Sequence, residues 1–185
     1  MSPPSLQASA GMLPIDDFAR SSGPASQALS NFGTSWRVVT DTVMGGASSA
    51  GMDFTTLAER RCLRLAGTVS LENNGGFVQA SLDLAADGGS FDASQYAGIE
   101  LDVYGNGESY NLHLRTADTW IVWQSYRASF QAPPGWRTLR LPFGGFEAYR
   151  TRAPLDLRQL KRIGLVAIGR EMQADLCLGR IAFYR

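Results

Sequence analysis

Three short segments hold the residues whose types and spacing could bind a ligand or carry out acid–base chemistry. In the first segment, Asp41 is followed by the turn Met44-Gly45-Gly46 and by Ser48. Adjacent glycines permit backbone conformations that a Cβ atom would block. The segment is therefore either a tight hairpin between two strands or a loop whose backbone approaches a ligand or a partner.

The second segment places a carboxylate beside two amides, in the order Glu72-Asn73-Asn74, before another pair of glycines. Asparagine and glycine by themselves account for a turn, but they do not require the carboxylate. Together the three side chains could hydrogen-bond hydroxyl groups or hold a cation such as calcium, which takes oxygen ligands. The alternative, which the pattern favours, is that they hold the neighbouring loop by hydrogen bonds.

The third segment combines arginine with aromatic residues. Arg115 ends a strand-like stretch, and Trp120, Trp123, Tyr126 and Arg127 follow it closely. An arginine beside aromatic side chains on a sheet face can pair with a carboxylate or stack on a flat or sugar-like group. These five residues are therefore binding candidates, together with those of the first two segments.

A structural role for the third segment is the alternative. Tyr126 and Phe130 have the spacing of one strand face and could belong to the core, whereas Arg127 would point the other way. In that case the two arginines of this segment would pair with Glu72 or Asp41.

The elements that must position these segments follow a period of two along most of the chain. Ile99, Leu101 and Val103, for example, alternate with Glu100 and Asp102. Such alternation is typical of strands with one buried face, and glycine-rich turns separate them. About ten short strands at near-regular spacing predict an all-β sandwich or jelly roll. The expected strands are Trp36–Asp41, Ala47–Phe54, Cys62–Thr68, Phe77–Leu84, Ile99–Val103, Tyr110–Arg115, Ile121–Phe130, Trp136–Leu141, Ile163–Ile168 and Leu176–Tyr184.

Helical signals are weak. The sequence predicts one helical turn at Phe91–Tyr96, capped by Asp92 or Ser94, and another at Leu155–Leu160. Phe143–Arg152 is expected to be an irregular connection.

Length and composition limit the class of protein. The chain has 185 residues, 44% of them apolar, and its 17 basic residues balance 17 acidic ones. We therefore expect one domain over residues 15–185 after a flexible segment 1–14, and no nucleic-acid partner. No apolar run approaches the length of about 18 residues that a transmembrane helix needs. The first 28 residues resemble neither a secretory signal nor a transit peptide, which predicts a cytoplasmic protein.

Two cysteines, Cys62 and Cys177, lie far apart and inside apolar runs. This placement favours two buried free thiols, because an unpaired cysteine behaves as a small hydrophobic residue. A single disulfide is the alternative, which the sequence leaves open.

The pattern of reactive residues does not predict an enzyme. The one histidine, His113, lies in the middle of a strand-like stretch, and the stretch from Gly46 to Ala50 departs from the Gly-x-Ser-x-Gly motif at its last position. We find no phosphate-binding glycine loop and no zinc spacing. The sequence therefore predicts no catalytic residue, no metal and no cofactor.

Read in order, the segments resemble a known family. The motifs are Trp-x-x-x-x-Asp-x-Val-Met-Gly-Gly from Trp36, Ser-Leu-Glu-Asn-Asn-Gly-Gly-Phe from Ser70, Leu-x-Leu-Arg-Thr from Leu112 and Ser-Tyr-x-Ala-x-Phe from Ser125. The chain resembles the complex I intermediate-associated protein 30 (CIA30) family over residues 15–185. The resemblance implies a galactose-binding-like jelly roll and a role in assembling respiratory complex I. It implies no catalytic residues.

Three functions follow as hypotheses. The first is an assembly factor or chaperone-like protein that recognises a protein partner, such as respiratory-complex assembly intermediates. The second is a module that binds carbohydrate or another small ligand through the aromatic residues near the Asn-Gly loops. The third is an enzyme with a polar cluster of Glu72, Asp41 and Arg115.

The position of the two Gly-Gly loops discriminates between these functions. If both loops meet beside Arg115, they form one site or one structural knot. A pocket at that point favours a ligand, whereas a flat apolar surface favours a protein partner.

Overall fold

The computed structural model describes residues 11–19 and 28–185. Most of the predicted flexible segment 1–14 lies outside the described residues. Within the described residues the chain forms twelve strands and four short 3-10 turns but no α-helix, which confirms the all-β prediction. No helix in this part of the chain is long and apolar enough to cross a membrane.

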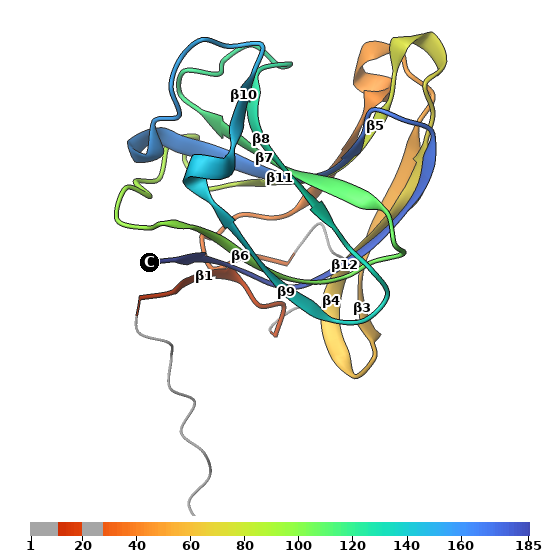
Figure 1. The fold of residues 1–185 in the computed structure, drawn as a ribbon, viewed down its shortest axis with the longest axis horizontal. Coiled ribbons are helices and arrows are strands. Elements are labelled where there is room, and N and C mark those ends of the chain that lie inside the picture. Colours follow the sequence, from red (N-terminus) through yellow and green to blue (C-terminus); the bar gives the residue numbers. More distant parts are fainter. Residues whose placement is uncertain (1–10, 20–27) are drawn as a thin grey trace, which may run out of the picture.

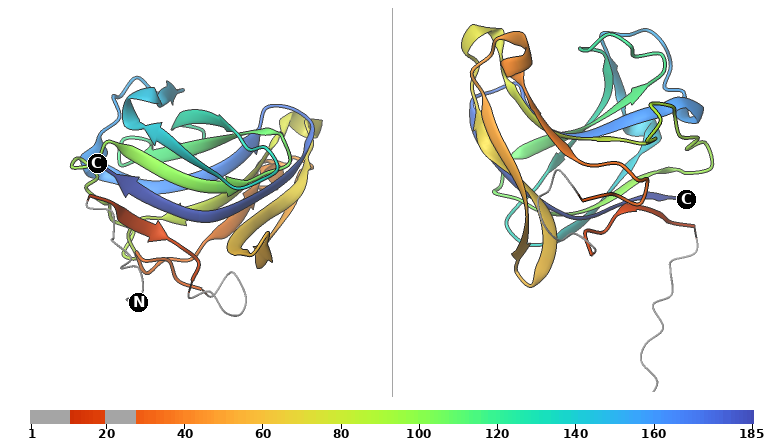
Figure 2. Two further views of the ribbon diagram at one scale, coloured as in Figure 1. Left: turned by 60° about the horizontal axis from the view of Figure 1, so that its bottom comes forward. Right: turned by 180° about the vertical axis from the view of Figure 1, so that it is seen from behind.

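The strands form two antiparallel sheets of six strands each, packed face to face (Figure 1). Sheet A has the order β3-β4-β12-β6-β9, and β1 pairs with β12 beside it. Its strands are β1 (Leu13–Asp16), β3 (Ser49–Leu57), β4 (Arg60–Val69), β6 (Gly98–Tyr104), β9 (Arg137–Pro142) and β12 (Met172–Tyr184). The red β1 beside the dark blue β12 is clear in the left view of Figure 2.

Sheet B has the order β10-β8-β7-β11-β5-β2. Its strands are β2 (Arg37–Thr40), β5 (Phe77–Asp83), β7 (Ser109–Thr116), β8 (Ser125–Gln131), β10 (Glu147–Tyr149) and β11 (Leu160–Ile168). The core lies between the two sheets and includes Trp36, Tyr110, Tyr126 and Phe183, all at most 1% exposed. It forms because each strand turns alternate apolar residues inward.

Differences from the predicted elements fall at short or irregular segments. Strand β8 begins at Ser125 rather than Ile121, because residues 117–124 form a loop that is closed by side-chain hydrogen bonds. The expected irregular connection Phe143–Arg152 contains β10, which pairs with β8. Strand β1 was not expected at all. Short edge strands carry little periodicity of their own and form only because a partner strand is adjacent.

The two predicted helical turns also differ in outcome. Residues Leu157–Gln159 form one 3-10 turn, whose cap is the side chain of Asp156. Residues Phe91–Tyr96 form no helix, because Phe91 instead pairs with Leu160 across an isolated β-bridge. The carboxylate of Asp92 accepts a hydrogen bond from the backbone of Ser94, which makes a turn rather than a helix cap.

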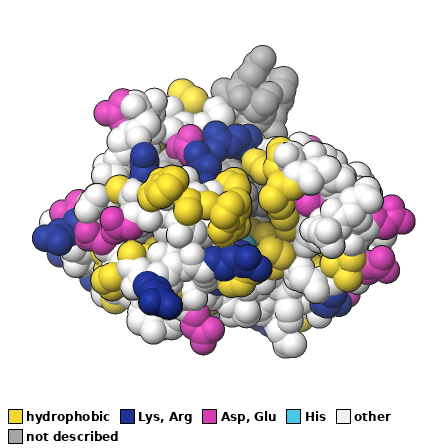
Figure 3. Space-filling view, turned by 90° about the horizontal axis from the view of Figure 1, so that it is seen from above, with side chains coloured by type: hydrophobic (Ala, Val, Ile, Leu, Met, Phe, Trp, Pro, Cys, Tyr) yellow, Lys and Arg dark blue, Asp and Glu magenta, His cyan; other side chains and the backbone are white. Residues whose placement is uncertain are grey.

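The outer face of sheet B is hollowed. In Figure 1, two groups of loops stand above this sheet: the turns after β2 and β4 on one side, and the loops around β8 and β10 on the other. The right view of Figure 2 shows the same two groups from behind. Figure 3 looks down between them and shows apolar and Lys or Arg side chains gathered around a hollow.

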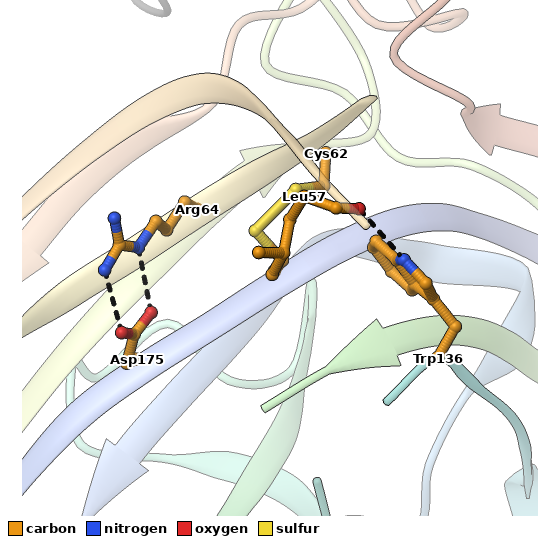
Figure 4. Close-up of a disulfide and its surroundings, with 6 residues drawn as sticks. Leu57, Cys62, Arg64, Trp136 and Asp175 are labelled. Atoms are coloured by element: carbon orange, nitrogen blue, oxygen red, sulfur yellow. Dashed lines mark hydrogen bonds and ion pairs between the residues drawn. A yellow bond between two sulfur atoms is a disulfide. The ribbon is translucent and has the colours of Figure 1, made fainter. Parts of the chain in front are cut away.

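The cysteines form a disulfide, so the expectation of two free thiols is wrong. Cys62 in β4 and Cys177 in β12 lie on neighbouring strands of sheet A, with their Cα atoms 5.5 Å apart. Figure 4 shows the bond beside the Arg64–Asp175 ion pair. The strand pairing brings together two thiols that the sequence separates by 115 residues. Such bonds are typical of oxidising compartments, whereas the cytoplasmic location stays a prediction.

Candidate functional site: a cleft over sheet B

The two Gly-Gly loops meet at the side chain of Asp41, which has no exposed surface. Its carboxylate accepts hydrogen bonds from the backbone N–H groups of Ser48 (2.9 Å), Gly76 and Phe77 (3.2 Å), and from the Ser48 hydroxyl. The Ser48 hydroxyl oxygen in turn accepts a bond from the backbone of Ser70 (2.9 Å). We call these residues the Asp41 knot.

Two glycines make this knot sterically possible. An ideal Cβ atom on Gly46 would lie 2.4 Å from the Asp41 carboxyl carbon, and one on Gly75 would lie 2.5 Å from its Oδ2. Neither distance is tolerated, so the carboxylate can be enclosed only if both positions are glycine. The sequence left two interpretations of these loops open, a structural turn or a loop that approaches a ligand or a partner. The enclosed carboxylate supports the structural interpretation.

The hydrogen bonds of the Asp41 knot also set the pH range over which the charged carboxylate stabilises the fold. Burial alone would raise the pKa of Asp41, but the hydrogen bonds from Ser48, Gly76 and Phe77 outweigh it and lower the pKa. The charged form therefore stabilises the fold above the pKa of an unfolded aspartate, about 3.9. This stabilisation is lost as the pH falls through the lower folded-state pKa.

We therefore expect the Asp41→Asn variant to differ most from the parent protein at neutral pH. The difference in the free energy of unfolding should shrink as the pH falls below about 4, because the parent carboxylate becomes protonated at its lowered pKa. Urea unfolding of both proteins at a series of pH values measures it. A difference that is constant with pH would show that the charge of Asp41 does not stabilise the knot.

The knot positions one wall of a cleft. The 3-10 turn Asp41–Met44 exposes Val43 (68%) and Met44 (54%), while Asn74, Gly75 and Gly76 form the rest of this wall. Asn73 and Asn74 both have positive φ (56° and 58°), a conformation that asparagine tolerates better than most residues. This backbone requirement explains the two asparagines without a ligand.

Arg115 holds the opposite wall. Its Nη2 donates hydrogen bonds to the backbone oxygens of Thr119 (2.6 Å) and Ile121 (3.0 Å) in the loop 117–124. The loop then exposes Val122 (61%) and Trp123 (54%) at the rim of the cleft. Thus one guanidinium both lines the cleft and orders the loop that carries its aromatic rim.

The floor of the cleft is the outer face of sheet B. Residues from all six strands line it, because a side chain that points away from the core faces the cleft. His113 in β7 lies opposite Gly164 in β11, and the side chain of Gln79 lies over this glycine. An ideal Cβ atom on Gly164 would be 2.4 Å from the Gln79 Oε1 atom, so the glycine makes room for the amide.

Tyr149 stands between two arginines at one end of the floor. The guanidinium of Arg127 lies 3.5 Å from the centre of the Tyr149 ring, and that of Arg150 lies 5.3 Å from it. A hydrogen bond with Arg150 and the charges of both arginines lower the pKa of the Tyr149 hydroxyl. This end of the cleft is therefore electropositive.

The cleft has a volume of about 400 Å³, and no Asp or Glu side chain from the described residues lines it. Its apolar lining residues are Val39, Val43, Met44, Phe77, Val122, Trp123, Val166 and Ile168. Its polar and charged lining side chains are Asn74, Gln79, His113, Arg115, Gln124, Ser125, Arg127, Tyr149, Arg150 and Arg162.

The structure places the predicted site residues in different environments. Those that line the cleft are Met44, Asn74, Arg115, Trp123 and Arg127. Gly45 ends the 3-10 turn with φ of 85°, and Glu72 and Asn73 are exposed outside the cleft. Trp120, 80% exposed, borders a neighbouring pocket that shares Arg115 and Arg162 with the cleft, but it does not line the cleft itself.

Four residues need correction. Asp41, Gly46 and Ser48 belong to the buried knot rather than to a binding surface, and Tyr126 belongs to the core, as the structural alternative proposed. The structural alternative also expected Arg115 and Arg127 to pair with Glu72 or Asp41. This expectation is wrong, because Arg115 donates to the loop backbone and Arg127 donates to Ser125. The polar cluster of Glu72, Asp41 and Arg115 does not form, since neither carboxylate lines the cleft.

Several lining residues were not predicted, among them Gln79, Val122, Tyr149, Arg150 and Arg162. The alternation within β5 and β11 could have placed Gln79 and Arg162 on the outer face of their sheet. No local signal could have placed Tyr149 and Arg150, because they reach the cleft only through the pairing of β10 with β8.

Comparisons with known proteins agree with this architecture. Residues 25–178 match the family described as complex I intermediate-associated protein 30 (CIA30). Among curated proteins, none is similar enough in sequence to count as a relative. The solved structures that match share the sandwich fold, which confirms the prediction of a galactose-binding-like jelly roll.

Two matching structures are of a family 11 carbohydrate-binding module from Clostridium thermocellum. The module from the cellulosomal cellulase Lic26A-Cel5E has a TM-score of 0.71 and 14% identity, covering 94% of both chains. A complex with a β-1,3-1,4-mixed-linked tetrasaccharide has a TM-score of 0.70 and 14% identity, covering 94% of this chain and 95% of the other. A family 30 carbohydrate-binding module has a TM-score of 0.55 and 15% identity, covering 74% and 73%. At these identities the likeness concerns the fold.

Proposed function

We propose that this chain, which belongs to the CIA30 family, is a non-catalytic binding protein that holds an extended segment of a partner protein in the cleft over sheet B. The observation that carries the proposal is the composition of the cleft. Exposed aliphatic side chains form its rim, and hydrogen-bonding groups lie on its floor. The name of the family, which refers to intermediates of complex I, supports a protein partner.

The dimensions of the floor fit an extended chain. The cleft crosses six strands, and a spacing of about 4.8 Å between strands gives a length of roughly 24 Å. An extended peptide rises about 3.3 Å per residue, so roughly seven residues would fill the cleft. Val43, Met44 and Val122 offer aliphatic contacts for apolar side chains of such a segment, whereas sugars favour flat aromatic rings.

Peptide display tests the proposal. Random dodecapeptides are selected on the purified protein, and the enriched peptides are titrated against the parent and against two tryptophan variants. Trp123 lines the cleft, so Trp123→Ala should weaken binding roughly tenfold or more, as truncation of a buried aromatic anchor does. Trp120→Ala is the control, because Trp120 is an exposed tryptophan of the same loop that does not line the cleft.

The outcomes separate clearly. Peptides that lose affinity only with Trp123→Ala support a segment bound in the cleft. If no peptide is enriched, or if both tryptophan variants bind every peptide as the parent does, the cleft is not a peptide site. Circular dichroism and thermal unfolding of both variants confirm that each one is folded.

Carbohydrate binding is the second candidate. The observation in its favour is the pair of aromatic rings at the cleft, Trp123 and Tyr149, on a fold shared with carbohydrate-binding modules. If this candidate is correct, calorimetry with a mixed-linked β-glucan tetrasaccharide or other neutral oligosaccharides should detect binding that Trp123→Ala abolishes. A complete absence of heat across such a panel would reject it.

A further inference from the structure

The charges in the cleft are unbalanced. Four arginines line it, and no carboxylate among the described residues does. Only Arg162 has a carboxylate partner, because its Nε donates to Asp83 (2.6 Å). In the described part of the chain, no ion pair involves Arg115, Arg127 or Arg150.

Elsewhere in the described chain, half-buried arginines are neutralised. On the outer face of sheet A, Arg60 and Arg180 bind Asp102, and Arg180 also binds Glu100. Arg115 and Arg127 are equally half-buried and lack any such partner. Glu147 lies opposite Arg127 in the strand register, yet Arg127 stacks on Tyr149 instead. Two half-buried charges without a counter-charge are unfavourable, so a ligand that supplies the missing negative charge would stabilise them.

Mutual repulsion adds to this cost. Burial and the charge of Arg162 lower the pKa of Arg115, and burial lowers the pKa of Arg127, with the charge of Arg150 adding to the effect. Both guanidinium groups remain charged at neutral pH nonetheless. The floor of the cleft therefore keeps a positive potential that attracts an anion.

Unpartnered buried donors are the second, independent observation. The Nε atom of Arg115 and the Nε2 atom of His113 are buried and have no hydrogen-bond partner among the residues that the structure describes. His113 is 8% exposed and lines the cleft. Burial and the charge of Arg127 lower its pKa to about 3, so its ring is neutral at pH 7 and Nε2 can donate or accept one bond. Buried polar atoms of this kind are normally satisfied, so a ligand is expected to supply the partners.

We propose that the segment bound in the cleft is acidic, with carboxylates that bind Arg115 and Arg127 and apolar residues between them that contact the aliphatic rim. This inference rests on the proposed function and specifies the chemistry of its ligand. The guanidinium group of Arg127 can bind a carboxylate through two parallel hydrogen bonds from its Nη atoms, because only its Nε donates to Ser125. Arg115 keeps its Nη2 on Thr119 and Ile121 and offers its other donors to a second carboxylate.

Matched peptides test whether the ligand must carry negative charge. A series of fluorescein-labelled octapeptides contains valine and leucine with two glutamates at varied positions, and a second series carries glutamine at the same positions. Fluorescence anisotropy at 50 mM and 300 mM NaCl measures both series. We expect the best glutamate peptide to bind roughly 10- to 100-fold more tightly than its glutamine twin at low salt, the range for hydrogen bonds between charged groups. High salt should reduce this advantage.

Arginine variants locate the carboxylates. Arg127→Gln should remove most of the advantage of glutamate over glutamine while leaving the loop 117–124 in place, because Arg127 does not bond to this loop. Arg115→Gln should do the same but also loosens the loop, so its thermal unfolding is measured in parallel. Arg137→Gln is the control, since Arg137 is an exposed, unpaired arginine in sheet A.

Each outcome decides a separate point. Equal binding of the two series overturns the acidic ligand but leaves the peptide cleft intact. Absence of binding by both series overturns the acidic ligand together with the proposed function. Binding of an acidic oligosaccharide such as trigalacturonate, without binding of any peptide, would assign the arginines to a different class of ligand and overturn the inference.

Discussion

The Asp41→Ala variant is expected to unfold with a free energy at least about 3 kcal/mol lower than that of the parent protein. The substitution leaves the N–H groups of Ser48, Gly76 and Phe77 without an acceptor, and each unsatisfied buried donor costs about 1–3 kcal/mol. It also leaves a void beside Gly46 and Gly75, which have no side chains to fill it. Urea unfolding followed by tryptophan fluorescence measures the loss.

Two variants control this prediction. Asp53→Ala removes an exposed carboxylate from β3 and should change the free energy of unfolding by no more than about 0.5 kcal/mol. Gly46→Ala keeps the carboxylate but introduces a Cβ atom that collides with it, and it should destabilise the protein as well. If Asp41→Ala is no more harmful than Asp53→Ala, the Asp41 knot does not hold these loops.

Loss of the disulfide is expected to be comparably severe, at about 4 kcal/mol. The bond closes a loop of 115 residues in the unfolded chain, and a loop of this size predicts a large entropic contribution. Both sulfur atoms are buried between β4 and β12, so the reduced thiols keep their packing and the loss comes mainly from the unfolded state. Urea unfolding with and without dithiothreitol measures it.

The double variant Cys62→Ala/Cys177→Ala supplies the control. Its stability should match that of the reduced protein to within the cost of the two missing sulfur atoms, and dithiothreitol should not change it further. A parent protein that unfolds identically with and without the reductant, while mass spectrometry shows two free thiols after reduction, would contradict the expected stabilisation.

The Asp41 knot also links stability to binding. It fixes the wall that carries Val43 and Met44, and two of its donors, Gly76 and Phe77, themselves line the cleft. Variants that destabilise the Asp41 knot should therefore weaken ligand binding indirectly. Arg127→Gln and Trp123→Ala are the better probes of the ligand. Both side chains face the cleft and neither belongs to the knot.

The strands were predictable because their signal is local. Alternating residues such as Ile99, Glu100 and Leu101 encode one apolar face, and the structure packs both apolar members into the core. Glu100, on the other face, is buried as well, because Arg140 and Arg180 pair with it. The alternation in β7 likewise buries Leu112 and Leu114 in the core, whereas Arg115 faces the cleft. Strand β10 was missed because three residues are too few for a periodic pattern, and its pairing with β8 decides its existence.

The sequence by itself determined the two-layer sandwich, the turns and the outward face of the arginine-bearing strand, because neighbouring residues set each of these. Only the tertiary structure decided that Asp41 is a buried acceptor, since its donors Gly76 and Phe77 lie 35 and 36 residues further along the chain. It likewise decided the pairing of the cysteines, and it left Arg115 and Arg127 without an ion pair among the described residues. Such features depend on which strands become neighbours, and long-range burial of the core selects those neighbours rather than any local preference.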